Sequence, residues 1–136
     1  GAAQRDAEAI MACFRALPQV AQVLGSGLTK TSVRTHDGLQ ADWFGLTFVN
    51  PPYSQPRVWI EKALAETQRD PTLRVILLLP AATDTGWYHD LLVPHATIQF
   101  LRGRLRFLDW DGQPAGQPTS GSLLAYLPKG WGHALP

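Results

Sequence analysis

Residues 73–79, with the sequence LRVILLL, constrain the fold more than any other segment of this chain. Apart from Arg74, every residue in the run is apolar. A half-buried strand alternates apolar and polar residues, whereas a run without alternation is typical of a strand covered on both faces. Pro80 ends the run, because proline has no N–H to donate to a sheet. We therefore expect a central strand in an α/β fold, with a mostly parallel sheet flanked by helices on both sides.

Other segments fit the same α/β arrangement. Apolar residues at helical spacing, ended by Pro or Asp-Pro, predict helices at residues 6–17 and 57–68. A shorter helix is predicted at residues 83–92, with Thr83 or Asp84 as its cap. Short apolar runs bounded by Gly, Pro or polar residues predict further strands at residues 20–24, 46–49, 97–101, 104–108 and 122–127. Residues 28–43 are mostly polar without a sustained period, which predicts a long loop.

The composition limits the class of protein. A chain of 136 residues has room for one domain, and its 45% apolar and 17% charged residues argue against disorder. Cys13 is the one cysteine, so no internal disulfide can form. No window approaches the roughly 18 apolar residues of a membrane span, and the start lacks the layout of a signal peptide. We expect a cytoplasmic protein without a membrane partner, and the net charge of +1 gives no general argument for nucleic-acid binding.

The segment that carries chemistry is residues 46–54, LTFVNPPYS, in which an apolar strand ends at Asn50. The amide oxygen of Asn50 can accept a hydrogen bond from an exocyclic NH2 group, and the carbonyl of Pro51 can accept the second hydrogen. Tyr53 can stack on a base that has left its duplex. Asn and Pro also form turns, so a strand that merely ends in a turn is the alternative. The position directly after an apolar strand favours a site that handles a planar, amino-bearing base.

Several motifs together resemble a known family. The strings DWFGLTFVNPPYS, VILLLPAATDTGWYHD and IQFLRGRLRF occur in the order found in the phage-type, Dam-like DNA N6-adenine methyltransferases. The resemblance covers residues 35–127 and implies a Rossmann-like methyltransferase fold. It also implies methyl transfer from S-adenosylmethionine to adenine N6 in DNA, with Asn50, Pro51, Pro52 and Tyr53 as the catalytic tetrad. A second family segment is matched by Asp84, Thr85, Trp87 and His89, without a role for each.

The sequence departs from this family on the side of the methyl donor. Such proteins carry a strand ending in an acidic Asp-Pro element ahead of the tetrad, whereas residues 17–32 contain no acid. Gly25 and Gly27 could form a glycine turn that lets the donor approach the backbone. Asp37 or Asp42 could supply a ribose-binding carboxylate, although each also fits a loop or cap residue. We expect one methyltransferase-like domain, residues 1–136, with a base-handling half at residues 46–127 and a shortened donor half.

Basic residues near the third family motif suggest a DNA-binding surface. In an extended strand, Arg102, Arg104 and Arg106 would lie on one face and could contact successive phosphates. Lys30 and Arg34 in the long loop could extend this patch, and an ordinary solvated strand face is the alternative. Trp43 and Trp87 lie in motif-bearing segments and are candidate base platforms. No metal is expected, because the spacing of His89, Asp90 and His95 is not that of a known site.

Three functions remain open at this point. The first is an adenine-specific DNA methyltransferase, in the cytoplasm of a bacterial host if the gene is borne by a phage or plasmid. The second is a shortened, inactive relative that binds DNA or a protein. The third is a subunit that completes its donor pocket with a second chain, for example as a dimer. A seven-stranded methyltransferase sheet needs about 170 residues or more, so we expect the donor half to be shortened or missing.

Overall fold

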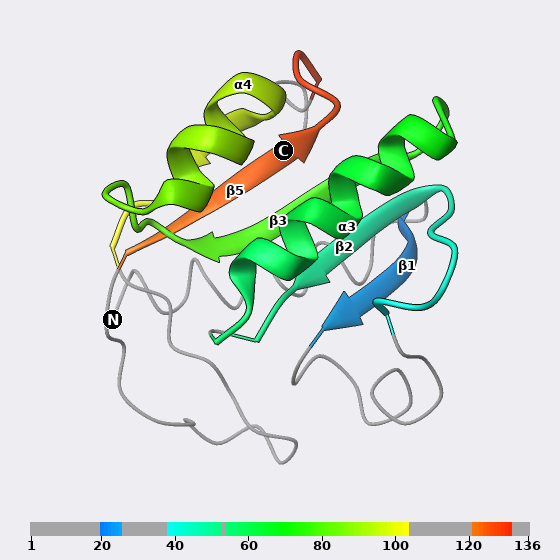
Figure 1. The fold of residues 1–136 in the computed structure, drawn as a ribbon, viewed down its shortest axis with the longest axis horizontal. Coiled ribbons are helices and arrows are strands. Elements are labelled where there is room, and N and C mark those ends of the chain that lie inside the picture. The colour runs from blue at the N-terminus through cyan, green and yellow to red at the C-terminus, as the bar shows by residue number, and fades with distance from the viewer. Residues whose placement is uncertain (1–19, 26–37, 53, 104–120, 132–136) are drawn as a thin grey trace.

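A five-stranded sheet is the frame of the protein in the computed structural model, which describes residues 20–25, 38–52, 54–103 and 121–131 (Figure 1). The strands are β1 (Val20–Gly25), β2 (Leu46–Asn50), β3 (Arg74–Pro80), β4 (Thr97–Phe100) and β5 (Ser122–Leu127). The helical elements are α3 (Pro56–Arg69), the π-helix η1 (Tyr88–Leu92) and α4 (Val93–His95). The predicted helix at residues 6–17 and strand at residues 104–108 lie outside the described residues.

The strands lie in the order β1-β2-β3-β5-β4, and the sheet is mixed. The expected parallel arrangement is found for β1, β2 and β3. The last strand, β5, lies between β3 and β4 and runs antiparallel to both. It starts at the edge where β4 ends, since Phe100 pairs with Leu123, and a strand that starts where the previous one ended must run the opposite way.

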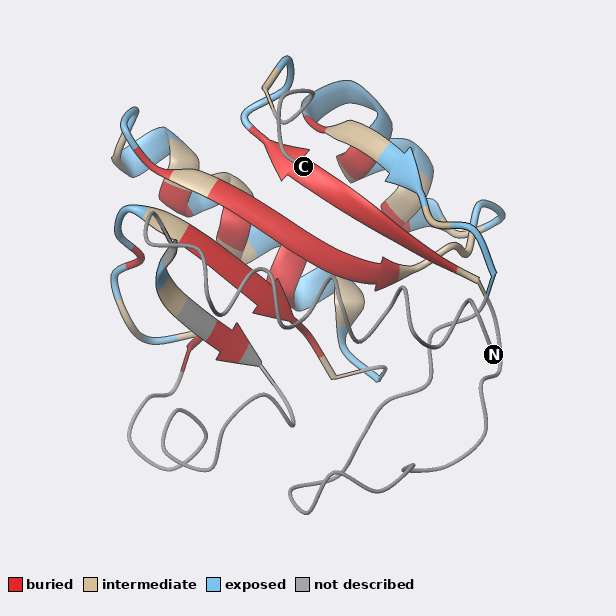
Figure 2. Cartoon of the chain, turned by 180° about the vertical axis from the view of Figure 1, so that it is seen from behind, coloured by how far each residue is buried: buried red, intermediate tan, exposed pale blue. Residues whose placement is uncertain are grey.

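Strand β3 is the central, doubly covered strand that its sequence predicts. Val75, Leu77 and Leu79 face the helices and join their core cluster, whereas Ile76 and Leu78 alternate with them and are equally buried. Figure 2, which views the sheet from the side away from the helices, shows the residues of β3 and β5 as buried along nearly the whole length of both strands. The described helices, α3 and the η1–α4 segment, both cover the other face (Figure 1), so helices on both sides are not found among the described residues.

The helix after β3 differs from its predicted form at both ends. Helical structure begins at Gly86, and Thr85 rather than Thr83 or Asp84 caps it, because the Tyr88 N–H donates to Thr85 Oγ1 at 3.4 Å. The helix also continues beyond Leu92 to His95. Pro94 lacks an N–H and its ring would clash with the carbonyl four residues earlier, so the turn widens and the Val93 N–H donates to the carbonyl of Tyr88.

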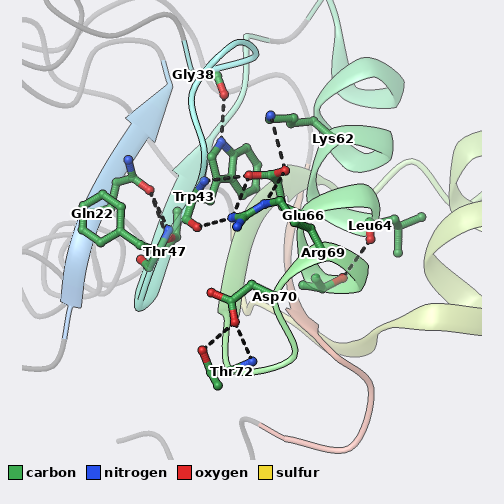
Figure 3. Close-up of polar contacts among 12 residues, drawn as sticks. Gln22, Gly38, Trp43, Thr47, Lys62, Leu64, Glu66, Arg69, Asp70 and Thr72 are labelled. Atoms are coloured by element: carbon green, nitrogen blue, oxygen red, sulfur yellow. Dashed lines mark hydrogen bonds and ion pairs between the residues drawn. The ribbon is translucent and has the colours of Figure 1, made fainter.

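Residues 38–44 are anchored to α3 (Figure 3). The Trp43 indole stacks on Trp59 at 6.4 Å and donates to the carbonyl of Gly38 at 2.8 Å. The Trp43 backbone N–H donates to Glu66 Oε1 at 2.7 Å, and the Trp43 carbonyl accepts from Arg69 Nη2 at 2.6 Å. The later part of the predicted loop is therefore fixed by α3 just before β2 begins.

Hydrogen bonds oppose the effect of burial on the Glu66 carboxylate. Burial would raise its pKa, but the hydrogen bonds from Arg69 and from the Trp43 N–H, with the charge of Lys62, hold the pKa below its usual value.

None of the helices among the described residues is long and apolar enough to span a membrane.

Candidate active site

The carboxyl ends of three parallel strands bring the candidate site residues to one edge of the sheet. Asn50 at the end of β2 pairs in register with Gly25 at the end of β1. Beyond β2 lies the end of β3, where Pro80 pairs with Ser122 and the Ala81 N–H donates to the Gly121 carbonyl at 2.9 Å. In open α/β sheets, ligands bind outside the carboxyl ends of the strands.

Asn50 is held firmly at this edge. It is 7% exposed and is the last residue of β2. Because it alternates with Val49, which belongs to the cluster under α3, Asn50 lies on the face of the sheet opposite α3. Pro51, also buried, follows as the expected stop of the strand. The strand thus presents an amide side chain from a rigid support.

The turn after Asn50 leads directly into α3. The Gln55 N–H donates to the Pro52 carbonyl at 3.1 Å, and the Trp59 N–H donates to the Gln55 carbonyl at 3.4 Å. Among the described residues, the hydrogen bonds of this turn engage the carbonyl of Pro52 and not that of Pro51. Tyr53 lies outside the described residues. An amide oxygen and a main-chain carbonyl are hydrogen-bond acceptors, the pair needed to hold an exocyclic amino group.

The second family segment follows β3 and starts at the same edge. Thr85 Oγ1 donates to the Ala82 carbonyl at 2.7 Å and accepts from Tyr88, so its hydroxyl fixes the helix start. Asp84 and His89 are exposed, and the His89 ring lies edge-on to the Tyr88 ring at 5.1 Å. Trp87 is 9% exposed and belongs to the core cluster. Trp87 and the fully buried Trp43 are therefore packing residues, and their prediction as base platforms is wrong.

The residues predicted for the methyl donor are only partly described. Gly25 lies beside Asn50, whereas Gly27 and Asp37 lie outside the described residues. Asp42 comes before β2, so it lies at the opposite edge of the sheet, about 16 Å from the carboxyl end if each strand residue advances about 3.3 Å. The prediction of Asp42 as a ribose ligand is therefore wrong, because a residue before a strand and one after it cannot share an edge.

Of the predicted DNA-binding residues, Arg102 is described and exposed. It follows β4, which ends at Phe100 on the same edge as Asn50. Arg102 lies beyond the end of β4, and Gly103 after it has a φ of 75°, so Arg102 is not part of a described strand. Arg104, Arg106, Lys30 and Arg34 lie outside the described residues.

Sequence reasoning missed Arg57, in the first turn of α3. A Cβ atom on Gly86 would lie 3.2 Å from Arg57 Nη2, so the guanidinium lies against the start of the next helix. The signal that could have found it is a cation in the first turn of a helix, where the dipole disfavours positive charge.

The described ranges contain no group of three or more His, Cys, Asp or Glu residues that could hold a metal ion.

Comparison with known proteins identifies one family. The family model described as DNA N-6-adenine-methyltransferase (Dam) matches residues 27–132. The match includes β2, β3, β4 and β5 together with both segments that meet at the carboxyl edge. The comparisons with curated proteins and with solved structures returned no match.

Proposed function

Because the chain belongs to the Dam family of DNA N-6-adenine-methyltransferases, we propose that it transfers a methyl group to the N6 atom of adenine in DNA at the carboxyl edge of its sheet. The observation that carries the proposal is the position of Asn50. It ends β2 beside the end of β1, and the Pro51 carbonyl follows it before the turn into α3. The proposed unit is a single domain with a Rossmann-like methyltransferase fold.

The proposed chemistry uses hydrogen-bond acceptors rather than a covalent nucleophile. The Asn50 amide oxygen and the Pro51 carbonyl each accept a hydrogen from N6 of an extruded adenine. This pairing draws electron density onto the nitrogen and exposes its lone pair. Tyr53 is proposed to stack on the base. The N6 proton that is lost on methylation is held by one of the two acceptors until it passes to solvent.

The methyl donor proposed for this site is S-adenosylmethionine, which when bound would supply an electrophilic methyl group, the S–CH3 bond breaking with its electron pair left on the sulfur of S-adenosylhomocysteine. Gly25 supports this fit, because it ends β1 directly beside Asn50, at the edge where such sheets bind ligands. Gly27 and Asp37 remain proposed donor ligands. Arg102, Arg104, Arg106, Lys30 and Arg34 remain proposed DNA contacts. The role of a second copy or a second chain in completing the donor pocket is likewise a proposal.

The test is transfer of a labelled methyl group from S-adenosylmethionine to adenine-containing duplex DNA. We expect Asn50→Ala to reduce the rate at least about 100-fold, since removing one preorganised hydrogen-bond partner costs about 10²–10³ in rate. Gln68→Ala is the matched control, because Gln68 is exposed near the far end of α3 and should leave the rate unchanged. An equal rate for Asn50→Ala and wild type contradicts the assignment.

Calorimetry with the donor separates the alternative function. The proposed enzyme binds S-adenosylmethionine and methylates DNA. The inactive alternative retains DNA with a salt-dependent affinity but shows neither donor binding nor methyl transfer. Mass measurement under assay conditions tests the dimer, because an active, strictly monomeric protein has a complete donor pocket in one chain.

A further inference from the structure

We propose that Arg57 contacts a phosphate of the DNA strand that carries the target adenine. This inference rests on the proposed function and adds a residue that the catalytic motif does not contain. Arg57 lies in the first turn of α3, and the hydrogen bonds from Gln55 to Pro52 and from Trp59 to Gln55 join that turn to the turn after Asn50. The first turn of α3, which carries Arg57, is therefore hydrogen-bonded through Gln55 to Pro52, two residues after Asn50.

The side chain of Arg57 extends toward the second segment at the same edge. Its Nη2 atom would lie 3.2 Å from a Cβ atom on Gly86, while Asp90 Oδ2 would lie 3.7 Å from that Cβ atom. Gly86 leaves room for the guanidinium at the start of the helix that follows β3. Arg57 thus reaches from the start of α3 to the second family segment, and its side chain is still 48% exposed.

The fold gains little from a cation at this position. The only ion pair of Arg57 among the described residues is with Glu61, at 3.9 Å, and the Glu61 side chain is 56% exposed. Exposed pairs of this kind contribute little to stability. The dipole of α3 also disfavours a positive charge in its first turn, and that turn contains no acidic residue.

The other cations of α3 have structural partners. Lys62 lies 3.6 Å from Glu66, and Arg69 pairs with Glu66 and with the Trp43 carbonyl. Arg57 is thus the cation of α3 that pairs with the exposed Glu61 and not with Glu66. An arginine fits a phosphate because its planar guanidinium donates two parallel hydrogen bonds. A phosphate next to the extruded adenine would replace the weakly held Glu61.

The chain offers a matched control in Arg74. It carries the same charge but begins β3, at the opposite edge of the sheet, where it donates to the carbonyls of Pro71 and Leu73. Arg57→Gln and Arg74→Gln therefore change the net charge equally, but only the first does so at the edge of the sheet where β2 ends. Glu61→Gln is a third variant, which removes the competing carboxylate and should tighten DNA binding.

The experiment measures DNA affinity by fluorescence anisotropy at several salt concentrations. Each phosphate contact contributes about 0.9 to the slope of log affinity against log salt. We expect Arg57→Gln to weaken binding about tenfold and to reduce the slope by about 1. Arg57→Lys should restore the slope, because it keeps the charge, and Arg74→Gln should leave affinity and slope near those of wild type.

Equal affinity and slope for Arg57→Gln, Arg74→Gln and wild type overturn the inference while leaving the proposed function in place, provided that the wild type methylates DNA. Failure of Arg57→Lys to restore the slope also contradicts a phosphate contact, since a structural defect would not depend on charge. A wild type that neither binds nor methylates DNA refutes the proposed function and this inference with it. Circular dichroism of each variant confirms that all of them are folded.

Discussion

Replacing Glu66 with alanine should destabilise the protein by weakening the attachment of residues 38–44 to α3. Glu66 is 5% exposed, and its carboxylate accepts hydrogen bonds from the Trp43 N–H at 2.7 Å and from Arg69 Nε at 3.2 Å. Lys62 lies 3.6 Å away. The substitution removes the acceptor that Trp43 and Arg69 share (Figure 3) and leaves only the direct hydrogen bond from Arg69 to the Trp43 carbonyl.

The size of the effect follows from what is left without a partner. The buried Trp43 N–H loses its acceptor, which costs about 1–3 kcal/mol. Lys62 loses its carboxylate, and Arg69, with a side chain 42% exposed, regains only part of its interactions from water. Breaking a fully buried ion pair costs about 3–5 kcal/mol, so the partial exposure here reduces the total to about 2–4 kcal/mol. Glu66→Gln keeps an acceptor for Trp43 and should cost about 1 kcal/mol.

Urea denaturation followed by tryptophan fluorescence measures this loss, since Trp43 and Trp59 lie in the affected contact. The midpoint should fall while the slope with urea stays the same. A double-mutant cycle with Arg69→Ala should show that the two losses are not additive, because both residues belong to one network. A Glu66→Ala variant within about 0.5 kcal/mol of wild type, the usual range for surface substitutions, would refute the anchoring role.

Two further predictions concern the same part of the fold. The pKa of Glu66 lies below its ordinary value of 4.5, so its contribution to stability is present above about pH 4.5 and is lost as pH falls through the folded-state pKa. The difference in unfolding free energy between wild type and Glu66→Gln should therefore shrink from pH 7 to pH 3, and a constant difference would contradict the shift. Gly45 has a φ of 65°, and a Cβ there would lie 2.7 Å from the Ala21 Cβ, so Gly45→Ala should cost about 2–4 kcal/mol in urea denaturation. Gly130→Ala is its control, because φ is 103° but no atom lies within 4 Å, and a loss as large as that of Gly45→Ala would show that the close approach to Ala21 is unimportant.

The elements that could be predicted from the sequence are those with clear ends. A proline follows β2, and another is the last residue of β3. The predicted range 46–49 ends one residue before β2 does, and the predicted range 73–79 lies one residue ahead of β3. The predicted range 122–127 matches β5, and α3 extends one residue beyond the predicted 57–68 at each end. Local signals suffice for the two strands, because proline has no N–H to continue the hydrogen bonding of a sheet.

The features that could not be predicted depend on residues distant in sequence. Nothing in residues 28–43 shows that Trp43 would be held by Glu66, which is 23 residues away. The placement of β5 between β3 and β4 is likewise a property of the whole sheet. For the candidate site, the motif predicted Asn50 at the end of a strand, but the approach of Arg57 to Gly86 arises from the packing of two helices.

The position of β5 has a consequence for how the protein is made. During synthesis, β3 leaves the ribosome long before β5, which spans residues 122–127 and pairs with six residues of β3. Until then the apolar edge of β3 has no partner on that side, and β4 has no described strand to join it to the sheet. Such pairing between distant segments is slow, and an unpaired strand edge invites aggregation. The nascent chain is therefore most vulnerable just before β5 emerges, when the turn after Asn50 already exists but the sheet that supports it is still open.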